Sequence, residues 1–587
     1  MLLRRSIGCR FGPGPQFFRL FIFFPLWALS PVVSPAQNRY DILISEFLPD
    51  PSPSIGMPES SFIELYNRSG HDFSLFNWKI SNANTTASIK TDYLLKADSF
   101  LILCPTSSVA AFSSLGPAQG ISGFPSLNND AGDIILSSES GSVIHAIHYD
   151  KSWFENGIKS SGGWSLEMID PASPCSEKEN WTASISPSGG TPGKKNSVYA
   201  ENPDAESPSL IRAIPVDSVE LVLIFDEALD SASAADPSNY FLSDEIGSPE
   251  NATALAPFFD HVSIRLKNPL ITGKIYTVSV QGLRDCQGNE ISLQNNCKAG
   301  IPVRLQPGDV IINEVLFNPP PYGSDYIELF NRSTSIIAGS SLFIAGIDAN
   351  GNLKDPEGLV TEEHLLFPGE YFLLTEDPAW VLHNYPLAPV SQILSLPALP
   401  SMPDDLGKIA LLNASGDRID ELDYDHHWHS PLLTSESGIS LERINPGLPA
   451  SLASNWTSAA ASAGFGTPGY KNSELFSAGN PDSDLISVEP KIFSPDQDGY
   501  QDFLFIHYQL PAAGFMGSIS IYDILGRVVR KLVNNILWGT SGSFRWDGLD
   551  ESMNRLPTGH YILYIELFLP DGTVKKQKFV CVLAGNS

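Results

Sequence analysis

Apolar and β-branched residues occur along this chain in short runs separated by polar turns. The segment 62–67 (FIELYN) is typical, because aromatic and aliphatic residues surround a single glutamate, as they do in many strands. Residues 132–150 hold two such runs on either side of Gly141, and glycine readily adopts the positive φ of a hairpin turn. Helical signal is short and confined to 107–112 and 377–385. The pattern therefore predicts an all-β protein.

The same blocks of sequence occur twice. The first copy reads ILISEFLPDP (42–51), FIELYNRSG (62–70), GDIILSSESGSVIHAIHYD (132–150), GWSLEMIDP (163–171), NWTAS (180–184) and GTPGKKNS (190–197). The second copy reads VIINEVLFNP (310–319), YIELFNRST (326–334), GKIALLNASGDRIDELDYD (407–425), GISLERINP (438–446), NWTSA (455–459) and GTPGYKNS (466–473). Between 132–180 and 407–455 the copies align without a gap at a constant offset of 275 residues. So long a period indicates duplicated domains rather than a solenoid of small repeats.

These blocks resemble lamin tail domains of exported bacterial proteins. The glutamate-containing opening strands, the long hairpin, the GTPG ending and the segment DFSLFNW (72–78) carry the resemblance. The second copy departs from the family at SSLFIAG (340–346), so its edge strand is expected to differ. The resemblance covers 37–199 and 306–475, and it implies two Ig-like sandwiches without catalytic machinery.

Two other regions have their own patterns. Residues 203–303, with FDEALD (225–230) and YTVSV (276–280), resemble the Ig-like module of bacterial S-layer and surface proteins, which implies a spacer. Residues 484–587, with SISIYDILGRVVRKL, FRWDGLD and LPTGHYILYIEL, resemble the Ig-like domain of flagellar hook-capping proteins. That domain recurs at the C-termini of exported Bacteroidota proteins, where such domains serve as type IX secretion sorting signals. The resemblance implies that this region engages the export machinery.

Residues 1–36 have the order of a secretory signal peptide. Basic residues end at Arg19, an apolar run covers 20–33, and small residues stand at positions −3 and −1 before Gln37. The run is shorter than the roughly 18 residues needed to span a bilayer, so cleavage is expected rather than anchoring. No later segment is apolar enough to span, and the mature chain is expected to be secreted or held at the cell surface by other means.

Composition sharpens this picture. The chain has 587 residues, 46 Gly and 46 Pro, with 36 Lys+Arg against 66 Asp+Glu. Residues 1–36 contain four arginines and no acid, so their removal leaves 32 basic and 66 acidic residues and a net charge of −34. A chain of this charge argues against nucleic acid as a partner, because binding to the phosphate backbone needs clustered Lys and Arg.

Five cysteines remain after the signal is removed: Cys104, Cys175, Cys286, Cys297 and Cys581. An odd, sparse set without CxxC is neither a disulfide scaffold nor a zinc site. In an oxidising compartment Cys286 could pair with Cys297, and Cys104 with Cys175. The alternative for each is a buried thiol.

The strongest metal candidate is the segment 494–502 (SPDQDGYQD). Asp496, Asp498 and Asp502 stand at positions 3, 5 and 9 of an EF-hand-like loop, where their oxygens can converge on calcium. Position 12 is Phe505 rather than glutamate, so an Asx-rich turn is the alternative. No cofactor is expected apart from calcium at this loop.

Three histidines lie in DYDHHWHSP (423–431), where they could bind a transition metal together with two aspartates. The matching segment of the first copy, DKSWFENG (150–157), has no histidine. The simpler interpretation is an exposed loop in which Trp428 packs as Trp153 does.

Glu46 and Glu64 recur as Glu314 and Glu328. Paired carboxylates perform glycoside hydrolysis, but identical placement in both copies favours a structural role, with hydrogen bonds from a neighbouring loop or arginine. Nucleophile, zincin, P-loop and dinucleotide motifs are absent from the sequence.

Together these features predict four tandem Ig-like β-sandwich domains after a signal peptide. We expect a signal peptide (1–36), two lamin tail domains (37–199 and 306–475), an S-layer-type domain (203–303) and a C-terminal domain (484–587). The expected function is a non-catalytic one in adhesion or envelope structure, with a cell-surface or extracellular polymer as partner. The alternative is an accessory protein that binds extracellular DNA or polysaccharide.

Overall fold

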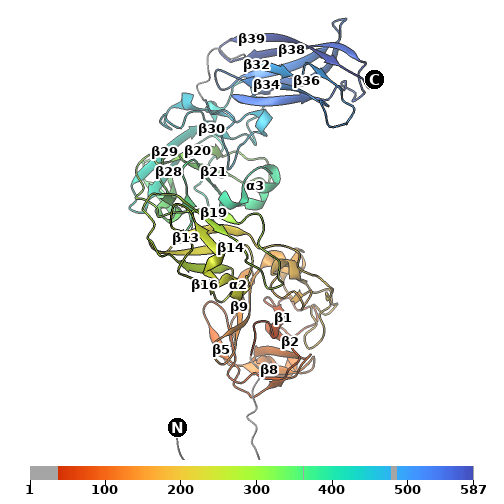
Figure 1. Ribbon diagram of the computed structural model, residues 1–587, viewed down its shortest axis with the longest axis vertical. Coiled ribbons are helices and arrows are strands. Elements are labelled where there is room, and N and C mark those ends of the chain that lie inside the picture. Colours follow the sequence, from red (N-terminus) through yellow and green to blue (C-terminus); the bar gives the residue numbers. More distant parts are fainter. Residues whose placement is uncertain (1–36, 361–362, 477–484, 586–587) are drawn as a thin grey trace, which may run out of the picture. The chain divides into compact units, whose positions relative to one another are not determined.

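The computed structural model describes residues 37–360, 363–476 and 485–585 (Figure 1). Nearly all regular structure in these ranges is strand, with three short α-helices, α1 (Val109–Phe112), α2 (Ser231–Ala234) and α3 (Pro378–Asn384). The predicted all-β class is therefore confirmed. The expected signal peptide lies outside the described residues. No helix in the described ranges is long and apolar enough to cross a membrane.

The chain divides into two compact units. One unit holds the residues up to Pro171 together with Trp181–Tyr199, and the other holds Ala172–Asn180 together with the residues from Ala200 onward. The short segment Ala172–Asn180 belongs by sequence to the first repeat copy, but it packs with the second unit. The division into four domains stays a prediction.

The first copy contains two main sheets. The six-stranded sheet has the order β12 (Trp181–Ala183), β11 (Leu166–Met168), β1 (Ile42–Leu48), β2 (Phe62–Asn67), β7 (Phe100–Pro105) and β8 (Ala118–Ile121). The four-stranded sheet has the order β10 (Val143–Asp150), β9 (Ala131–Ser137), β4 (Lys79–Ser81) and β5 (Thr86–Ser88). The short ribbon of β3 (Phe73–Ser74) and β6 (Leu94–Leu95) completes it. We call this arrangement the first sandwich.

The second copy repeats this topology strand for strand, as the second sandwich. Its six-stranded sheet has the order β27 (Ile393–Ser395), β26 (Tyr371–Thr375), β21 (Tyr326–Asn331), β20 (Val310–Leu316), β30 (Leu441–Arg443) and β31 (Trp456–Ser458). Its other sheets are β24 (Leu353–Gly358), β23 (Leu342–Ile347), β28 (Leu406–Asn413) and β29 (Arg418–Asp425), and the ribbon of β22 (Ile337–Ala338) and β25 (Leu365–Leu366). In both sandwiches the edge pair β7–β8 or β26–β27 is parallel.

Local details of the duplication agree with the sequence prediction. Gly141 and Gly416 turn the β9–β10 and β28–β29 hairpins with φ of 89° and 82°. Trp181 and Trp456 are buried, each 3% exposed. The divergent segment 340–346 nevertheless forms β23, which pairs with β24 and β28 in the place that β4 holds in the first sandwich. The strand differs in its length of six residues against three, not in its position.

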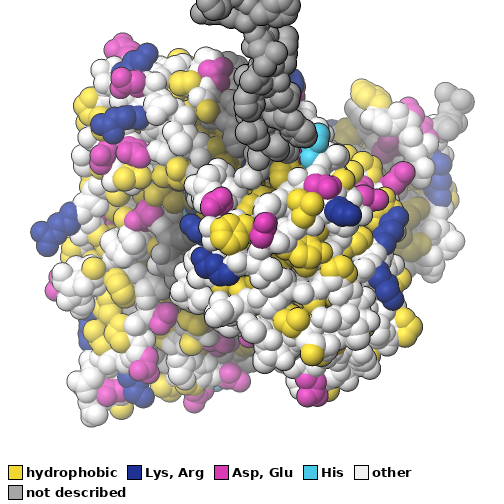
Figure 2. Space-filling view, turned by 90° about the horizontal axis from the view of Figure 1, so that it is seen from below, with side chains coloured by type: hydrophobic (Ala, Val, Ile, Leu, Met, Phe, Trp, Pro, Cys, Tyr) yellow, Lys and Arg dark blue, Asp and Glu magenta, His cyan; other side chains and the backbone are white. Residues whose placement is uncertain are grey.

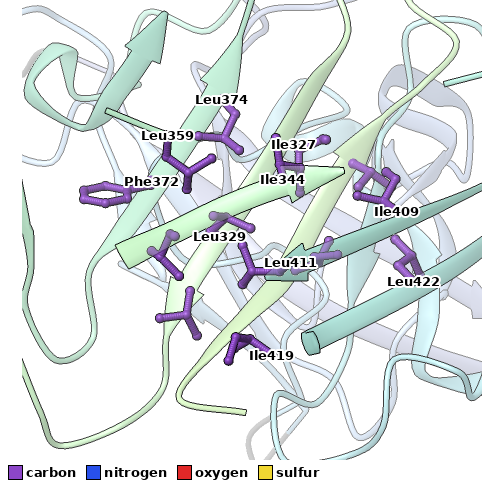
Figure 3. Close-up of a cluster of buried hydrophobic side chains, with 14 of the residues drawn as sticks. Ile327, Leu329, Ile344, Leu359, Phe372, Leu374, Ile409, Leu411, Ile419 and Leu422 are labelled. Atoms are coloured by element: carbon purple, nitrogen blue, oxygen red, sulfur yellow. The ribbon is translucent and has the colours of Figure 1, made fainter. Parts of the chain in front are cut away.

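A closely packed core lies between the two sheets of the second sandwich (Figure 3). The apolar side chains of facing strands interdigitate there, because alternate positions on each strand point to the same side. The labelled side chains come from β21, β23, β26, β28, β29 and the loop after β24: Ile327, Leu329, Ile344, Leu359, Phe372, Leu374, Ile409, Leu411, Ile419 and Leu422. Burying each such side chain stabilises the fold by about 1.5–3 kcal/mol.

Residues 203–303 form a sheet of four strands and one of three around a core of their own. The sheets are β13 (Leu210–Pro215), β14 (Glu220–Phe225), β17 (His261–Arg265) and β16 (Asn251–Leu255), and β15 (Tyr240–Leu242), β18 (Tyr276–Val280) and β19 (Asn296–Ala299). Residues 285–289 form a turn, since the Asp285 carboxylate accepts hydrogen bonds from the backbone N–H groups of Gly288 and Asn289.

The described part of the C-terminal region also has two sheets. They are β32 (Ile486–Glu489), β34 (Leu504–Gln509) and β37 (Ser541–Trp546), and β33 (Ile492–Phe493), β39 (Val574–Leu583), β38 (Gly559–Phe568), β35 (Met516–Tyr522) and β36 (Val528–Leu537). Trp546 is fully buried between Phe493 and Tyr561, and its indole N–H donates to the Leu549 carbonyl. Trp546 therefore fills the core beside the Trp546–Gly548 turn.

Candidate functional sites

Three glutamates lie side by side across the six-stranded sheet of the first sandwich. In the strand register Glu46 on β1 stands opposite both Glu64 on β2 and Glu167 on β11. All three are fully buried. A β-bulge between Ile44 and Glu46 shifts the register of β1 and changes the direction of its side chains at this point.

The closing GTPGKKNS segment supplies the hydrogen-bond donors for these carboxyl groups. The backbone N–H of Thr191 donates to Glu46 Oε1 at 2.8 Å, and that of Gly193 donates to Glu64 Oε2 at 2.5 Å. Ser197 Oγ donates to Glu167 Oε2 at 2.8 Å. The glutamates therefore bind the final segment of the copy onto its sheet. Gly193 is required there, because its φ is +82° and an added Cβ would meet the Gly116 backbone at 2.8 Å.

The second sandwich has the same arrangement of three buried glutamates. Glu314, Glu328 and Glu442 are again fully buried, with Glu314 opposite the other two. Thr467 N–H donates to Glu314 at 2.9 Å, and Gly469 N–H donates to Glu328 at 2.6 Å. The predicted hydrogen bonds from a neighbouring loop to the paired glutamates are thus present in both copies.

A threonine hydroxyl contacts two carboxyl groups of each trio. Thr467 Oγ1 lies 2.6 Å from Glu314 Oε2 and 2.8 Å from Glu442 Oε1. A hydroxyl has one proton and can donate to only one of these oxygens. A proton on one of the two carboxyl groups would let that group donate to Oγ1 and satisfy both contacts. In the first sandwich Thr191 Oγ1 lies 2.8 Å from Glu167 and 3.4 Å from Glu46.

Burial disfavours the ionised form of these carboxyl groups. Desolvation raises the pKa of Glu64 and that of Glu442 to about 8. It also raises the pKa of Glu46, and the neighbouring Glu64 and Glu167 carboxyls raise it further. Buried carboxyl groups this close cannot all ionise together.

Sequence reasoning missed the third member of each trio. Glu167 and Glu442 occupy the middle of short apolar strands in the repeated blocks SLEM and SLER. The signal was available, since a lone carboxylate recurs at the same place in both copies. Its partners lie on segments distant in the chain, which only the fold brings together.

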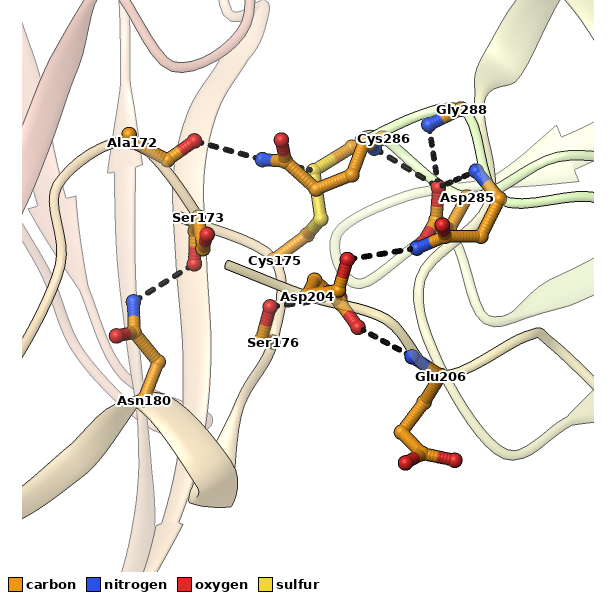
Figure 4. Close-up of a disulfide and its surroundings, with 12 residues drawn as sticks. Ala172, Ser173, Cys175, Ser176, Asn180, Asp204, Glu206, Asp285, Cys286 and Gly288 are labelled. Carbon is orange, nitrogen blue, oxygen red and sulfur yellow. Dashed lines mark hydrogen bonds between the residues drawn. A yellow bond between two sulfur atoms is a disulfide. The ribbon is translucent and has the colours of Figure 1, made fainter. Parts of the chain in front are cut away.

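The disulfide differs from both predicted pairings. Cys175 bonds to Cys286 (Figure 4), whereas Cys104, Cys297 and Cys581 are free. The expected Cys286–Cys297 and Cys104–Cys175 bridges are therefore wrong. Cys175 lies in the segment Ala172–Asn180, which leaves the first sandwich. Cys104 stays buried in that sandwich on β7.

Hydrogen bonds reinforce the surroundings of this disulfide (Figure 4). Gln287 Nε2 donates to the Ala172 carbonyl at 2.7 Å, and Ser176 Oγ donates to Asp204 at 2.7 Å. The segment that carries Cys175 is thus held to residues 203–303 by several bonds of different kinds.

An acidic cavity of about 720 Å³ adjoins the disulfide. Carboxylate oxygens of Asp204, Glu227 and Asp285 lie within 4.8 Å of one another. Burial, together with the nearby carboxylates of Asp204 and Asp285, raises the pKa of Glu227 to about 8. The Asp285 carboxylate already accepts hydrogen bonds from three backbone N–H groups of its own turn. Acidic groups often cluster without an ion, so we assign no ligand to this cavity.

The predicted calcium loop brings its three aspartates together. One carboxylate oxygen each of Asp496, Asp498 and Asp502 lies within 4.8 Å of the others. Some of these carboxylate oxygens already accept hydrogen bonds within the loop. Asp502 accepts the backbone N–H of Gln497 at 2.6 Å and that of Gly499 at 2.9 Å. The geometry suits both a calcium loop and an Asx-rich turn, so calcium binding stays a prediction.

The three histidines separate into a surface pair and a buried residue. His426 and His427 lie on the 3-10 turn η8 (His426–Trp428), with ring centroids 4.0 Å apart. His429 is 3% exposed, packs against Phe317, and shares a hydrogen bond of 2.8 Å between its Nδ1 and Ser458 Oγ. Burial lowers the pKa of His429 to about 4, so it is neutral.

The tryptophan beside these histidines packs as predicted. Trp428 stacks near Trp456 with centroids 6.4 Å apart, and Trp153 lies 6.2 Å from Trp181 in the first sandwich.

Surface charge is mixed on the face drawn in Figure 2. Lys and Arg side chains lie among Asp and Glu side chains there, and hydrophobic side chains are scattered between them. This face therefore does not present a continuous basic stripe.

Comparison with known proteins supports part of this picture. Residues 35–151 match the Lamin Tail Domain family, which confirms the resemblance for the first copy over that range. No curated protein matches the chain.

Solved structures resemble the chain only distantly. The N-terminal part of the bacterial S-layer protein SbsC is 17% identical with a TM-score of 0.16, and the match covers 29% of this chain and 40% of that one. A tetra-tandem repeat from the extending region of a large adhesion protein is 11% identical, with a TM-score of 0.12 and coverages of 92% and 99%. PorZ, a surface component of the type-IX secretion system of Porphyromonas gingivalis, is 12% identical, with a TM-score of 0.16 and coverages of 78% and 56%. The chain thus spans well under two thirds of the SbsC fragment and of PorZ. At such TM-scores these likenesses carry no argument about function.

Proposed function

We propose that this chain is a non-catalytic secreted or cell-surface protein whose β-sandwiches have a structural or adhesive role. The Cys175–Cys286 disulfide carries the proposal. Disulfides form and persist in oxidising compartments outside the cytoplasm, and they are rare in proteins that stay in the cytosol. The order of residues 1–36, which is typical of an export signal, supports the same location.

The use of the buried carboxyl groups supports a structural role. All six glutamates of the two trios have no exposed surface, and their oxygens accept hydrogen bonds from the closing segments. A catalytic carboxyl must reach a substrate, whereas these groups hold a strand-closing segment in place. The placement recurs in both copies, as a shared requirement of the fold would demand.

Treatment of intact cells with a protease, followed by immunoblotting, tests the location. Loss of the full-length protein from intact cells, while a cytoplasmic marker survives, is the expected result. Protection of the protein until the cells are lysed, together with its recovery in the cytoplasmic fraction, would refute the proposal.

A second candidate function is binding of extracellular polysaccharide, and one cavity favours it over DNA. The cavity of about 380 Å³ lies in the first sandwich, and its lining includes Tyr66, Phe100, Tyr199, Asp98 and Lys195. Aromatic rings with a few polar groups are typical of small-molecule sites, and aromatic faces pack against the C–H faces of sugars. The net charge of −34 on the mature chain opposes DNA.

The second copy offers a matched control for this cavity. Tyr199 aligns with Leu475, so Tyr199→Leu introduces a residue that the fold already accepts there. Weaker retention of the variant on a polysaccharide array than of the parent chain is expected. Equal retention of both, or a salt-sensitive gel shift with DNA, would contradict this assignment.

We also propose that residues 484–587 act in export, on the resemblance of this region to type IX sorting domains. Removal of these residues is expected to leave the protein in the periplasm. Normal appearance of the truncated chain at the surface would contradict that role.

A further inference from the structure

The turn after β29 presents two imidazoles beside two carboxylates. Asp425 ends β29 and caps η8, because its Oδ1 accepts the backbone N–H of His427 at 2.9 Å. The half-buried Trp428 packs against the core of the second sandwich and anchors the turn. The two histidine side chains therefore stand on a rigid base rather than on a loose loop.

Each imidazole has a carboxylate beside it. His426 Nδ1 lies 3.1 Å from Glu436 Oε2, and His427 Nδ1 lies 2.7 Å from Asp425 Oδ1. Glu436 is the outer acid of the site, because its carboxylate accepts a hydrogen bond from His426 Nδ1–H and leaves the lone pair of His426 Nε2 free. An outer carboxylate orients and polarises a metal-binding histidine in this way. Asp425 Oδ1 and His427 Nδ1 are already adjacent, as two ligands of one ion would be.

The potential ligand atoms are already close together and open to solvent. One ligand atom of each of Asp425, His426 and His427 lies within 4.8 Å of the others. Tetrahedral ligands at about 2.0–2.1 Å from zinc are about 3.4 Å apart, so small rotations about side-chain bonds suffice. The His427 side chain is 77% exposed and that of His426 is 35% exposed, so an ion can reach them.

The first copy shows that the fold does not need these histidines. Its matching turn, η2 (Lys151–Phe154), is capped in the same way by Asp150, which accepts the N–H of Ser152 at 2.7 Å. Lys151 and Ser152 stand where the second copy has its histidine pair. The histidines and the orienting acid are thus an addition to a turn that is stable without them.

We propose that Asp425, His426 and His427, with Glu436 as the orienting acid, bind a transition-metal ion of the Zn²⁺ class. Imidazole nitrogen with one carboxylate suits Zn²⁺, Cu²⁺ and Ni²⁺, whereas Ca²⁺ requires oxygen ligands. The buried His429 is outside the site, since its Nδ1 is bonded to Ser458. This inference does not depend on the proposed surface role.

Isothermal titration of the mature chain with ZnCl₂ tests the proposal, with excess CaCl₂ present to occupy oxygen-only sites. The wild-type chain is expected to bind one equivalent of Zn²⁺ at this turn. The double variant His426→Lys/His427→Ser carries the residues of the first copy, and the heat from that equivalent should disappear while the circular dichroism spectrum stays unchanged.

A second variant separates orientation from ligation. Glu436→Gln removes the acid that orients His426 but no proposed ligand, and it should weaken Zn²⁺ binding about 10- to 100-fold. Absence of Zn²⁺ binding by the wild-type chain at millimolar concentration would overturn the proposal. Equal binding by the wild-type chain and the double variant would overturn it as well, because the ion would then lie elsewhere.

Discussion

Replacing Thr467 by valine removes a hydroxyl that contacts two of the three buried carboxyl groups in the second sandwich. Valine has nearly the same shape as threonine, so the main change is the loss of the hydroxyl. The backbone N–H of residue 467 still donates to Glu314 Oε1. The hydrogen bonds of Oγ1 to Glu314 Oε2 and Glu442 Oε1, at 2.6 and 2.8 Å, are lost.

The cost follows from the partners that remain. Glu442 Oε1 keeps a hydrogen bond from Ser473 Oγ at 3.0 Å, whereas Glu314 Oε2 loses the donor that the structure gives it. A buried polar atom left without a partner costs about 1–3 kcal/mol. Since 1.4 kcal/mol is tenfold in an equilibrium constant, local opening should become about 5- to 150-fold more frequent. Thr467 is only 1% exposed, so water cannot replace the lost bond without a change in structure.

Hydrogen exchange followed by mass spectrometry measures this effect in the intact chain. The amides of β20, β21 and β30 should exchange faster in Thr467→Val, while those of β1, β2 and β11 should be unchanged and serve as an internal reference. The mirror variant Thr191→Val should reverse the pattern, with a smaller effect because Thr191 is partly exposed and lies 3.4 Å from Glu46.

Two results would refute this reasoning. A change of less than about twofold in the second sandwich would mean that the trio does not hold the closing segment. Equal acceleration in both sandwiches would mean that the variant acts on the whole chain rather than on one carboxyl cluster.

Three further predictions follow from the same contacts. Burial raises the pKa of Glu64 and Glu442 from 4.5 to about 8, so the stability that their protons contribute is present below pH 4.5 and is lost as the pH rises through about 8. Calorimetry should therefore show lower melting temperatures at pH 9 than at pH 5, and equal or higher values at pH 9 would contradict the assignment. Cys286→Ser should destabilise the region 203–303 by about 2–4 kcal/mol in chemical denaturation, and an unchanged transition midpoint would count against the Cys175–Cys286 bond. If 494–502 is a calcium loop, titration with CaCl₂ should show binding that Asp498→Asn weakens, and no heat at millimolar calcium would leave only an Asx-rich turn.

The sequence was sufficient for features that depend on local pattern or on repetition. Alternation of apolar residues with turn residues predicted the strands, and Gly141 marked its hairpin because few other residues accept positive φ. Repetition predicted the duplication, and it predicted that Glu46 and Glu64 accept hydrogen bonds from a neighbouring loop, as they do. These inferences require only the pattern of neighbouring residues or the comparison of one repeat copy with the other.

The remaining features depend on distances that the sequence does not contain. Cys175 aligns with Ala450, which packs in the core of the second sandwich, so alignment gave no reason to expect that its segment leaves the first sandwich. His429 is two residues from His427, yet it turns into the core while His427 stays exposed. Side chains with the same chemistry thus acquire different roles from burial alone.

Differential alkylation of cysteines on intact cells tests the central claim most directly, because it reports location and chemistry together. Free thiols are blocked without reduction, and peptides released from the cell surface by protease are then identified by mass spectrometry. The account predicts a surface-derived peptide pair joined through Cys175 and Cys286, with Cys297 and Cys581 recovered as free thiols after denaturation. Recovery of the chain only from the cytoplasmic fraction, with Cys175 and Cys286 both alkylated, would contradict it.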